Sequence, residues 1–326
     1  MNPTTSAILK ILQENSGFTS GAHICSQLEI SRTAVWKHIK KLEKLGYQVE
    51  AISKRGYRLI HNTERPIPEA LNALLHTTDF ATDIEFFEEI SSTNRLLLDL
   101  AKSGIPGGLT VIADHQSAGH GRMQRSWFSP ANCNLYFSNL IRPNIAPYKA
   151  PQLALLSAVA IYDALKKLFP ELPVGIKWPN DIFIAGKKCA GILCEMQTDM
   201  TTVQHVVIGI GLNVNVAQFP DELKEHATSI RLHTGRKESR NTILAEILNQ
   251  LDKLYKTWLK DGLKPFIDRL NNASILKDKP IVVELANGEL EGVVKGINED
   301  GTLLVQKPDH TVHKIPSGEV HIKKFK

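Results

Sequence analysis

The sequence predicts an α+β fold built from three domains, and three observations support it. The 326 residues are 42% hydrophobic and 22% charged, which is typical of a globular chain of two or three domains. Helical periodicity dominates the first 45 residues, whereas short strand-like runs and helices alternate after residue 84. Between them, residues 61–68 contain two prolines and follow neither period. We therefore expect domains at residues 1–62, 63–277 and 278–326.

Positive charge is concentrated in the first of these domains. Residues 1–62 hold nine Lys/Arg and four Asp/Glu, so their net charge of +5 equals that of the whole chain. The other residues balance at 30 of each sign. This asymmetry favours a contact between the N-terminal domain and a polyanion, although charge alone leaves a solvated basic face as the alternative.

The remaining composition favours a cytoplasmic protein. The longest apolar run, residues 153–162, is shorter than the ~20 residues that cross a bilayer, so we expect no membrane association. The first residues lack a basic segment followed by an apolar block, so no secretory signal is expected. The four cysteines show neither a CxxC pair nor metal-finger spacing, which predicts free thiols in a reducing compartment.

The N-terminal domain has the pattern of a winged helix-turn-helix. A short amphipathic helix is expected at residues 6–13, and Ser20 and Ser31 are placed to cap a second and a third helix. The third helix carries one apolar stripe, formed by Val35, Ile39, Leu42 and Leu45. Two helices joined by a tight turn match a DNA-docking unit, which we place at residues 21–40. Its outer face presents Arg32, Thr33 and Lys37 as candidates for base edges and Lys40 as a further DNA contact.

A β-hairpin is expected directly after these helices. Residues 47–60 alternate like a strand, turn and return, which makes a wing with Arg55 at its tip. Phosphate contacts would supply most of the affinity for DNA. For Trp36, packing against neighbouring helices is the favoured interpretation, and contact with a base is the alternative. A three-helix protein-interaction module is the alternative for the whole segment.

The rest of the chain predicts a mixed or largely antiparallel sheet with helices packed against it, followed by a small barrel. Central strands are expected at residues 84–87, 110–113, 134–141, 175–178, 181–184, 189–196 and 203–214, and helices at 94–102 and 152–168. Further helices are expected at 241–260 and 263–270. Short strands at 281–285, 291–297 and 302–306, with tight turns at 286–288 and 298–301, indicate the barrel.

Five motifs in the central domain carry polar or glycine residues that a plain core would not need. Ser91-Ser-Thr-Asn stands at a strand-to-helix junction, where it can cap the helix or bind a polar ligand. Residues 116–127 combine two glycines, which admit a ligand close to the backbone, with Arg122 and Arg125, which can neutralise phosphate. This segment is neither a Walker loop nor a dinucleotide fingerprint. The other motifs are Lys177-Trp-Pro-Asn-Asp, Gly186-Lys-Lys-Cys-Ala-Gly and Gly209-Ile-Gly-Leu-Asn, whose two glycines require close packing inside a strand.

In this order, and behind a winged helix, the five motifs resemble those of the bifunctional bacterial biotin protein ligases, and the resemblance covers essentially the whole chain. It implies a class II synthetase-like central domain and an SH3-like C-terminal domain. It also implies activation of biotin with ATP and Mg²⁺ to biotinoyl-5′-AMP, followed by acyl transfer to a lysine of a biotin carrier protein of acetyl-CoA carboxylase. Such ligases also repress the biotin operon, as homodimers that bind operator DNA when the adenylate is bound.

The resemblance assigns roles to the motif residues. Biotin would be held by Ser92, Thr93, Asn94, Gln116, His120, Gly121, Arg122 and Lys188, with Asn94 alternatively orienting the segment around it. ATP and the adenylate would contact Arg122, Arg125 and Asn213. Lys188 would be the catalytic cation at the biotin carboxylate, and Asp181, with Asn180, would assist the metal or the incoming lysine. No metal site of the protein's own is expected, because Mg²⁺ would arrive with ATP.

The arginine-rich segment departs from the family at three positions. His120 and Met123 stand where the fully basic version has arginines, and Gln124 stands where it has a glycine. An unperturbed histidine is mostly neutral near pH 7, so we expect looser retention of the adenylate with the chemistry intact. Two alternatives stay open, namely a biotin-sensing repressor with a decayed catalytic segment and a related lipoyl-type ligase.

Overall fold

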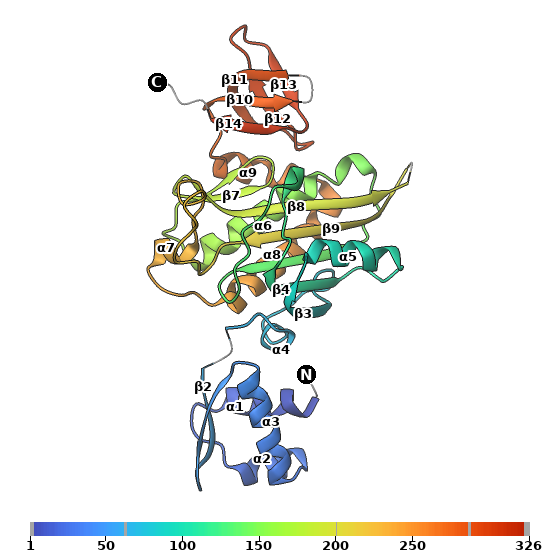
Figure 1. Ribbon diagram of the computed structural model, residues 1–326. Helices are drawn as coiled ribbons and strands as arrows, with labels where there is room; N and C mark the ends of the chain where they lie inside the picture. The colour runs from blue at the N-terminus through green and yellow to red at the C-terminus, as the bar shows by residue number, and fades with distance from the viewer. Residues whose placement is uncertain (1–2, 62–63, 200, 286–287, 323–326) are drawn as a thin grey trace. The chain divides into compact units, whose positions relative to one another are not determined.

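The computed structural model describes residues 3–61, 64–199, 201–285 and 288–322, in two compact units (Figure 1). One unit is Met1–Leu74 with Ser239–Asn241, and the other is Leu75–Glu238 with Thr242–Lys326. Within the described ranges, no helix combines the length and the apolar character that crossing a bilayer requires.

The N-terminal unit is a winged helix-turn-helix. Its helices are α1 (Pro3–Glu14), α2 (Gly21–Leu28) and α3 (Arg32–Lys44), followed by the hairpin of β1 (Gln48–Ile52) and β2 (Gly56–His61) and by α4 (Pro68–Leu71). Both predicted caps are confirmed, because Ser20 accepts a hydrogen bond from the His23 amide and Ser31 one from the Ala34 amide, each at 3.1 Å. The core contains Ile8, Leu12, Ile24, Ile39 and Leu42, each at most 1% exposed.

The exposure of Trp36 differs from the prediction. Its side chain is 52% exposed, whereas Val35 and Ile39 on the same helix are each 1% exposed. The expectation that Trp36 packs against neighbouring helices is therefore wrong. The physical reason is helical geometry, since position 36 lies about 100° round the helix from Val35 and so outside the one buried stripe of α3.

The wing is an antiparallel hairpin in which Glu50 stands opposite Arg58. This register pairs the Arg58 guanidinium with the Glu50 carboxylate, with 2.6 Å between Nη2 and Oε2. Arg55 and Arg58 both stack on the Phe18 ring, their guanidinium carbons 4.5 and 4.8 Å from its centroid. Phe18 therefore holds Arg55 at the turn, while Glu50 neutralises Arg58.

The second unit is built on a seven-stranded mixed sheet in the order β3-β4-β5-β9-β8-β7-β6. β3 (Asp83–Ile90) and β4 (Leu109–Gln116) pair in parallel, and the other neighbours pair antiparallel. The remaining strands are β5 (Leu135–Ile141), β6 (Val174–Lys177), β7 (Asp181–Ile184), β8 (Lys187–Thr198) and β9 (Val203–Leu212). The predicted mixed sheet is confirmed, with β3, β4 and β8 longer than predicted.

Helices pack against this sheet. α5 (Thr93–Lys102) places Leu97 and Ala101 against apolar residues of β4, β5 and β9. α6 (Gln152–Leu168), which has the predicted bounds, contacts β6, β7 and β8. The other helices are α7 (Ile230–Thr234), which the sequence did not predict, α8 (Arg240–Asp261) and α9 (Ile267–Ala273), with short 3₁₀ turns η1 (Arg122–Gln124), η2 (Pro147–Lys149) and η3 (Lys264–Phe266).

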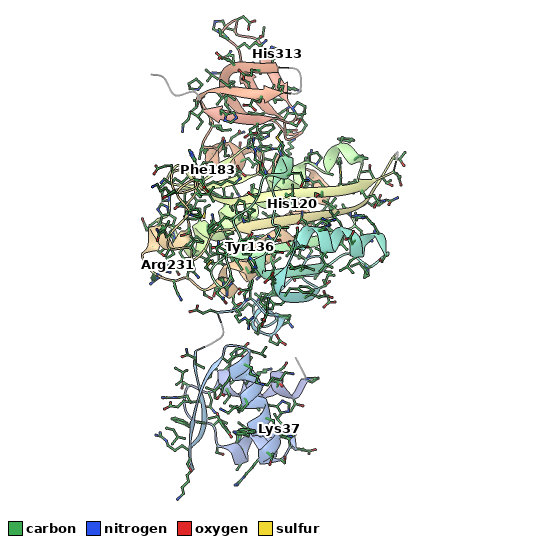
Figure 2. The ribbon with its side chains drawn as sticks, viewed as in Figure 1. Lys37, His120, Tyr136, Phe183, Arg231 and His313 are labelled. Atoms are coloured by element: carbon green, nitrogen blue, oxygen red, sulfur yellow. The ribbon has the colours of Figure 1, made fainter. Side chains whose placement is uncertain are left out.

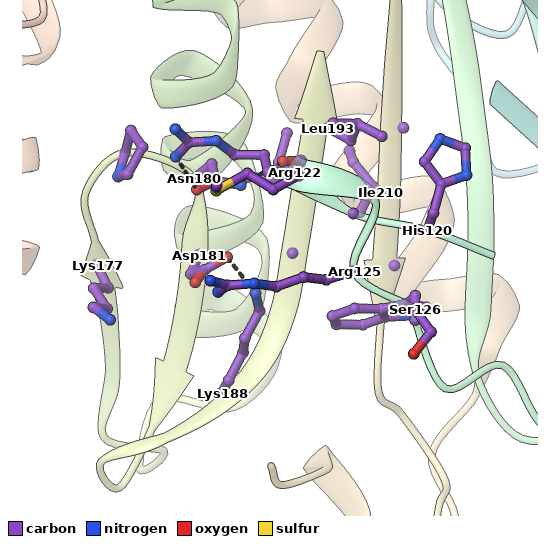
Figure 3. Close-up of a pocket in the computed structure, with 18 of the residues that line it drawn as sticks. His120, Arg122, Arg125, Ser126, Lys177, Asn180, Asp181, Lys188, Leu193 and Ile210 are labelled. Carbon is purple, nitrogen blue, oxygen red and sulfur yellow. Dashed lines mark hydrogen bonds and ion pairs between the residues drawn. The ribbon is translucent and has the colours of Figure 1, made fainter. Parts of the chain in front are cut away.

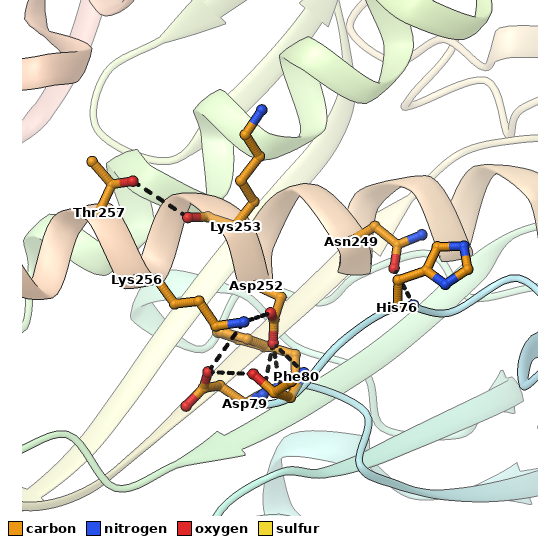
Figure 4. A network of polar contacts seen from close by, with 9 residues as sticks. His76, Asp79, Phe80, Asn249, Asp252, Lys253, Lys256 and Thr257 are labelled. Atoms are coloured by element: carbon orange, nitrogen blue, oxygen red, sulfur yellow. Dashed lines mark hydrogen bonds and ion pairs between the residues drawn. The ribbon is translucent and has the colours of Figure 1, made fainter.

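A polar cluster fixes the segment that leads into β3 (Figure 4). Asp252 of α8 is 3% exposed, and its Oδ1 accepts hydrogen bonds from the amides of Thr78 (2.8 Å), Asp79 (2.6 Å) and Phe80 (3.2 Å). Lys256, one turn further along α8, donates to Oδ2. Burial acts to raise the pKa of Asp252, but these hydrogen bonds outweigh it and hold the pKa below its ordinary value. One ionised carboxylate therefore anchors this segment to α8.

The C-terminal part of the second unit is a five-stranded antiparallel sheet in the order β13-β12-β11-β10-β14. Its strands are β10 (Pro280–Leu285), β11 (Gly288–Ile297), β12 (Leu303–Gln306), β13 (Val312–Ile315) and β14 (Glu319–Ile322), of which the last two were not predicted. The predicted turn at 298–301 is present, with the Gly301 amide bonded to the Asn298 carbonyl at 2.9 Å. Residues 286–287 of the other predicted turn lie outside the described residues.

Candidate functional site

A cavity of about 570 Å³ in the second unit brings the predicted pocket residues together (Figure 3). Its walls come from the seven-stranded sheet, from the segments that follow β4 and β9, and from the C-terminal sheet. A cavity of this size falls within the range of small-molecule sites. The predicted residues that line it are Ser92, Thr93, Asn94, Gln116, His120, Gly121, Arg122, Arg125, Asn180, Asp181, Lys188 and Asn213.

A hydrogen-bonded cluster at the start of α5 forms one part of the wall. Ser92 caps the helix, because its hydroxyl accepts from the Arg95 amide at 3.5 Å. The amide and the hydroxyl of Thr93 both donate to Gln116 Oε1, at 2.9 and 3.1 Å. The side-chain amide of Gln116 donates to the Ser129 hydroxyl at 3.5 Å. Helix capping and a polar pocket wall, which the sequence left as alternatives, are therefore provided by the same residues.

Asn94 makes its hydrogen bonds inside the protein. It is 4% exposed, and its amide group donates to Glu195 Oε2 at 2.7 Å. Its Oδ1 accepts from the Ser138 hydroxyl at 2.5 Å. A Cβ on Gly209 would lie 2.0 Å from Asn94 Oδ1, so this glycine makes room for the side chain on β9. These contacts favour an orienting role for Asn94 over direct contact with a ligand.

The arginine-rich segment, residues 119–127, folds back on itself beside the cavity. The Gly121 amide donates to the Arg125 carbonyl at 2.8 Å, and the Trp127 amide donates to the Gly119 carbonyl at 2.9 Å. Met123 and Gln124 adopt positive φ angles of 54° and 58°. This conformation costs a residue other than glycine about 1 kcal/mol or more. A glycine at position 124, as in the fully basic version of the segment, would therefore relieve strain.

Charged groups meet at one side of the cavity, as Figure 3 shows for Arg122, Arg125 and Lys188. Arg122 Nη1 donates to Asn180 Oδ1 at 3.3 Å. Arg125 forms two hydrogen bonds with the carboxylate of Glu319 on β14, at 2.5 and 2.6 Å. Lys188 Nζ lies 2.7 Å from Asp181 Oδ1, and the two side chains are 35% and 18% exposed. The three cations therefore remain accessible while each is held by a partner.

Lys187 and Lys188 are adjacent in sequence but have different surroundings. Lys187 Nζ donates to the Lys224 carbonyl at 2.7 Å, whereas Lys188 lines the cavity. Successive strand residues point to opposite faces, which explains the difference at the start of β8. A further lysine, Lys177, also lines the cavity, and burial lowers its pKa against the opposing effect of Asp181. The structure thus places Lys188, not Lys187, at the site.

Trp127 is a central pocket residue for which no role was predicted. It lies on the cross-strand pair of Gly191 and Gly211, where an added Cβ would come within 3.1 and 2.4 Å of the indole. Lys188 Nζ lies 5.5 Å from the centroid of the ring. The Trp127 Nε1 atom is buried, and no residue in the described part of the chain accepts its proton. The glycines of two predicted motifs therefore form a flat surface for an indole that faces the cavity.

Two further parts of the wall are distant in sequence. Asn213 is 4% exposed and donates to the Thr228 carbonyl at 3.1 Å, which fixes the segment after β9. In that segment Phe219 packs against Phe128, with ring centroids 6.1 Å apart. The cavity is also lined by residues that were not predicted, namely Phe128, Phe219, Leu223, His226, Ala227, Glu284, Ser317, Gly318 and Glu319. Only the aromatic pair at the end of the arginine-rich segment, Trp127-Phe128, offered a local signal in the sequence.

The predicted DNA contacts lie on the N-terminal unit, and all five are exposed. Arg32, Thr33, Lys37 and Lys40 belong to α3, where Figure 2 shows Lys37, and Arg55 belongs to the turn of the wing. Lys40 pairs with Glu43 one turn along the helix, at 2.7 Å. An exposed ion pair of this kind is weak, so Lys40 remains available to a polyanion.

Comparisons with known proteins cover each part of the chain. The biotin/lipoate A/B protein ligase family matches residues 86–213, an HTH domain matches residues 4–58, and the biotin protein ligase C-terminal domain matches residues 278–322. The bifunctional ligase/repressor BirA of Bacillus spizizenii is 38% identical over 95% of both chains. BirA of Escherichia coli K12 is 30% identical over 96% of this chain and 95% of its own.

A solved structure supports the same relationship. The biotin protein ligase from Aquifex aeolicus in complex with biotin and ATP matches with a TM-score of 0.65 at 27% identity, and the match covers 75% of this chain and 100% of that one. The match to the Bacillus spizizenii protein extends over 95% of this chain, which carries all three matched segments, the HTH domain, the ligase domain and the C-terminal domain. The chain therefore belongs to the biotin protein ligase family, in its bifunctional ligase/repressor branch.

Proposed function

We propose that this chain activates biotin with ATP to biotinoyl-5′-AMP, transfers the biotinoyl group to a lysine of a biotin carrier protein of acetyl-CoA carboxylase, and represses biotin synthesis genes. The observation that carries the proposal is the convergence of Arg122, Arg125 and Lys188 on a cavity that also holds the Thr93–Gln116 cluster. Cations suit a carboxylate and phosphates, whereas the polar cluster suits a small ring with donors and acceptors. The names of the relatives support the same function.

In the first step, a carboxylate oxygen of biotin attacks the α-phosphorus of ATP, the bond from that phosphorus to the bridging oxygen breaks, and pyrophosphate leaves. Lys188 meets the biotin carboxylate and then the acyl-phosphate oxygen of the adenylate. Arg122 and Arg125 meet the phosphates, where fixed cations stabilise the developing negative charge. His120 and Gly121 close over biotin with the rest of the segment, which keeps water from the mixed anhydride.

In the second step, the neutral amine of the carrier lysine attacks the acyl carbon of the adenylate. The bond from this carbon to the phosphate oxygen breaks, AMP leaves, and the amine nitrogen releases a proton as the amide forms. Asp181 and Asn180 lie beside the cations and orient the incoming amine. Ser92, Thr93 and Gln116 hold the ureido ring throughout, and Asn213 shapes the nucleotide side of the cavity.

Mg²⁺ would arrive with ATP. The residues present fit this metal, because the Asp181 carboxylate and the Asn180 amide oxygen both line the cavity and are hard oxygen donors. Mg²⁺ typically takes one or two such protein ligands together with substrate phosphates. Its chemistry there would be the neutralisation of phosphate charge as pyrophosphate departs.

For repression, we propose that the N-terminal unit binds operator DNA as a homodimer that forms when the adenylate is bound. Beyond Ile192, β8 pairs only with β9 among the described strands, so the outer edge of β8 is open to a second copy. Ligand that orders the segments around the cavity would lower the entropic cost of forming this interface. We also propose a cytoplasmic location, which suits the four free cysteine thiols.

A discharge assay tests the ligase proposal. The full chain is mixed with labelled biotin, ATP, Mg²⁺ and a biotin carrier domain, and both pyrophosphate and labelled carrier are measured. Lys188→Ala is expected to slow transfer by about 100-fold or more, since it removes a cation at the reacting carboxylate. Lys187→Ala is the matched control and is expected to keep the rate. Binding of biotin without transfer would indicate a sensing repressor, and a preference for lipoate would indicate a lipoyl-type ligase.

The repressor proposal has its own test. Biotin plus ATP are expected to raise both the dimer fraction in sedimentation and the affinity for operator DNA. The affinity should fall steeply with salt, because Lys/Arg contacts to phosphate release counterions. Equal affinity with and without the ligands would contradict the switch and leave the ligase proposal untouched.

A further inference from the structure

Trp36 is a large aromatic side chain in the middle of the outer face of α3. It is 52% exposed, whereas Trp178 and Trp258 are each 2% exposed. Among the described residues, no hydrogen bond, ion pair or ring contact involves Trp36. A single exposed aromatic residue is ordinary on a protein surface. Its meaning here depends on what surrounds it.

The neighbours of Trp36 on the helix surface are polar or basic. Residues three and four apart on a helix are adjacent, so Arg32 and Thr33 precede it and Lys40 follows it on the same face. All three are exposed, as is the next residue, Lys37. The charge of residues 1–62 is +5, and the wing adds an exposed Arg55. An anionic partner is therefore favoured at this face, and its centre offers that partner an apolar surface.

Duplex DNA combines these two properties in the major groove. Phosphates line its rims, and the C5-methyl groups of thymines present apolar surface on its floor. The second helix of a helix-turn-helix is the one that enters the groove, with its N-terminal residues against base edges. Trp36 is the fifth residue of α3, so it lies in that N-terminal half.

We propose that Trp36 is a specificity-determining residue that contacts thymine methyl groups in the major groove. The inference rests on the proposed repressor function and adds to it a residue with an identified partner group. An uncharged indole releases no counterions, so Trp36 contributes to discrimination between sequences and leaves the salt dependence unchanged. A phosphate contact by Lys40 would do the opposite, because it adds to the salt dependence and leaves discrimination between sequences unchanged.

The experiment uses the full chain with biotin and ATP, and a DNA duplex that the wild-type chain selects from a randomised pool. Affinities for this duplex and for a scrambled duplex are measured over a range of salt concentrations. Trp36→Ala is expected to weaken binding to the selected duplex by about 10-fold, and to change binding to the scrambled duplex by less than 2-fold. Lys40→Ala is expected to weaken binding to both duplexes and to reduce the salt slope by about one. Leu74→Ala, at another exposed apolar side chain of the same unit (41%), is the matched control.

Replacement of thymine by deoxyuridine at each selected position identifies the partner group. At one or two positions, deoxyuridine should lower the affinity of the wild-type chain as much as Trp36→Ala does. The same replacements should not lower the affinity of Trp36→Ala any further. If Trp36→Ala discriminates as the wild type does, or if its loss follows weakened self-association in sedimentation, the inference is overturned and the repressor proposal stands. If the wild-type chain selects no duplex at all, both fail. Unchanged melting of Trp36→Ala shows that any loss is not one of folding.

Discussion

The guanidinium of Arg125 and the carboxylate of Glu319 face each other in a bidentate pair, with 2.5 Å between Nη1 and Oε1 and 2.6 Å between Nη2 and Oε2. The pair links the arginine-rich segment to β14. Its hydrogen bonds lower the pKa of Glu319 and raise that of Arg125. Because the Arg125 side chain is 65% exposed, the pair adds little to stability. The pair affects nucleotide binding instead, because the Glu319 carboxylate and the nucleotide phosphates would compete for the Arg125 guanidinium.

Glu319→Gln is therefore expected to lower the KM for ATP by about 2- to 5-fold, which corresponds to the small free energy of an exposed ion pair. Arg125→Ala is expected to raise the KM for ATP and to leave the KM for biotin unchanged. The KM values of both variants are measured from the rate of pyrophosphate release at varied concentrations of ATP or biotin. Glu299→Gln, at an exposed carboxylate in the turn between β11 and β12 and outside the cavity lining, is the control. A higher KM for ATP in Glu319→Gln would show that the pair assists nucleotide binding instead.

His120→Arg is expected to slow the dissociation of biotinoyl-5′-AMP. His120 lines the cavity, and a permanent cation there would add an attractive interaction with the adenylate phosphate. The measurement is a chase of labelled adenylate from the purified complex, followed over a range of salt concentrations. Wild-type dissociation as slow as that of His120→Arg would contradict the expectation that the segment retains the adenylate loosely.

Gly211→Ala is expected to displace Trp127 and weaken ligand binding. The new Cβ would lie 2.4 Å from Trp127 Nε1, closer than any real contact. Overpacking of this kind costs about 1–3 kcal/mol, and each kcal/mol lowers Tm by about 2–4 °C in a unit of this size. Calorimetry without ligands measures the change in Tm, and calorimetry with biotin and ATP measures the loss of stabilisation by the ligands. Gly17→Ala is the control and is expected to leave both quantities unchanged, because its added Cβ has nothing within 4 Å.

Asp252→Asn is expected to destabilise the protein by about 1–3 kcal/mol at pH 7, since it removes a charged acceptor of buried hydrogen bonds. The folded-state pKa of Asp252 is depressed, so its contribution is present above the unfolded pKa of about 3.9 and is lost as pH falls through the folded pKa. The difference in unfolding free energy between wild type and variant should therefore shrink below about pH 4.

Asp79→Asn is the control for this experiment. The Asp79 side chain is 41% exposed, and its Oδ2 lies 3.8 Å from Lys256 Nζ, so it forms only a weak, exposed ion pair. It should change stability little at any pH. A constant difference between wild type and Asp252→Asn down to pH 2 would show that the stabilisation comes from packing rather than from ionisation.

Elements with local signals were predictable. Ser20 and Ser31 mark helix starts through their own hydrogen bonds, and the ends of α6 follow from its apolar pattern. β13 and β14 were not predictable, because residues 312–315 and 319–322 alternate weakly and become strands by pairing at the sheet edges. The position of Trp36 shows the same limit, since an aromatic side chain in an amphipathic helix is buried only where another element covers it.

The candidate site divides in a similar way. The motif residues could be located from sequence because each motif keeps its polar groups within a few positions. The sequence also predicted that other groups pack closely against Gly209 and Gly211. In the structure Asn94 packs against Gly209, and Trp127 packs against Gly211. The part of the wall formed by Ser317, Gly318 and Glu319 could not be predicted from the sequence. It depends on the contact between β14 and the arginine-rich segment, which lies almost 200 positions earlier in the chain.

The cavity draws on residues from Ser92 to Val320, although the strands of the central sheet end at Leu212. The central sheet is therefore complete at Leu212, whereas the pocket also needs the chain up to Val320. We expect a single proteolytic nick between the last central strand and β10 to leave most of the circular dichroism intact and still to abolish protection by ligand. Quality control of the purified protein should accordingly monitor ligand-induced protection rather than secondary structure alone.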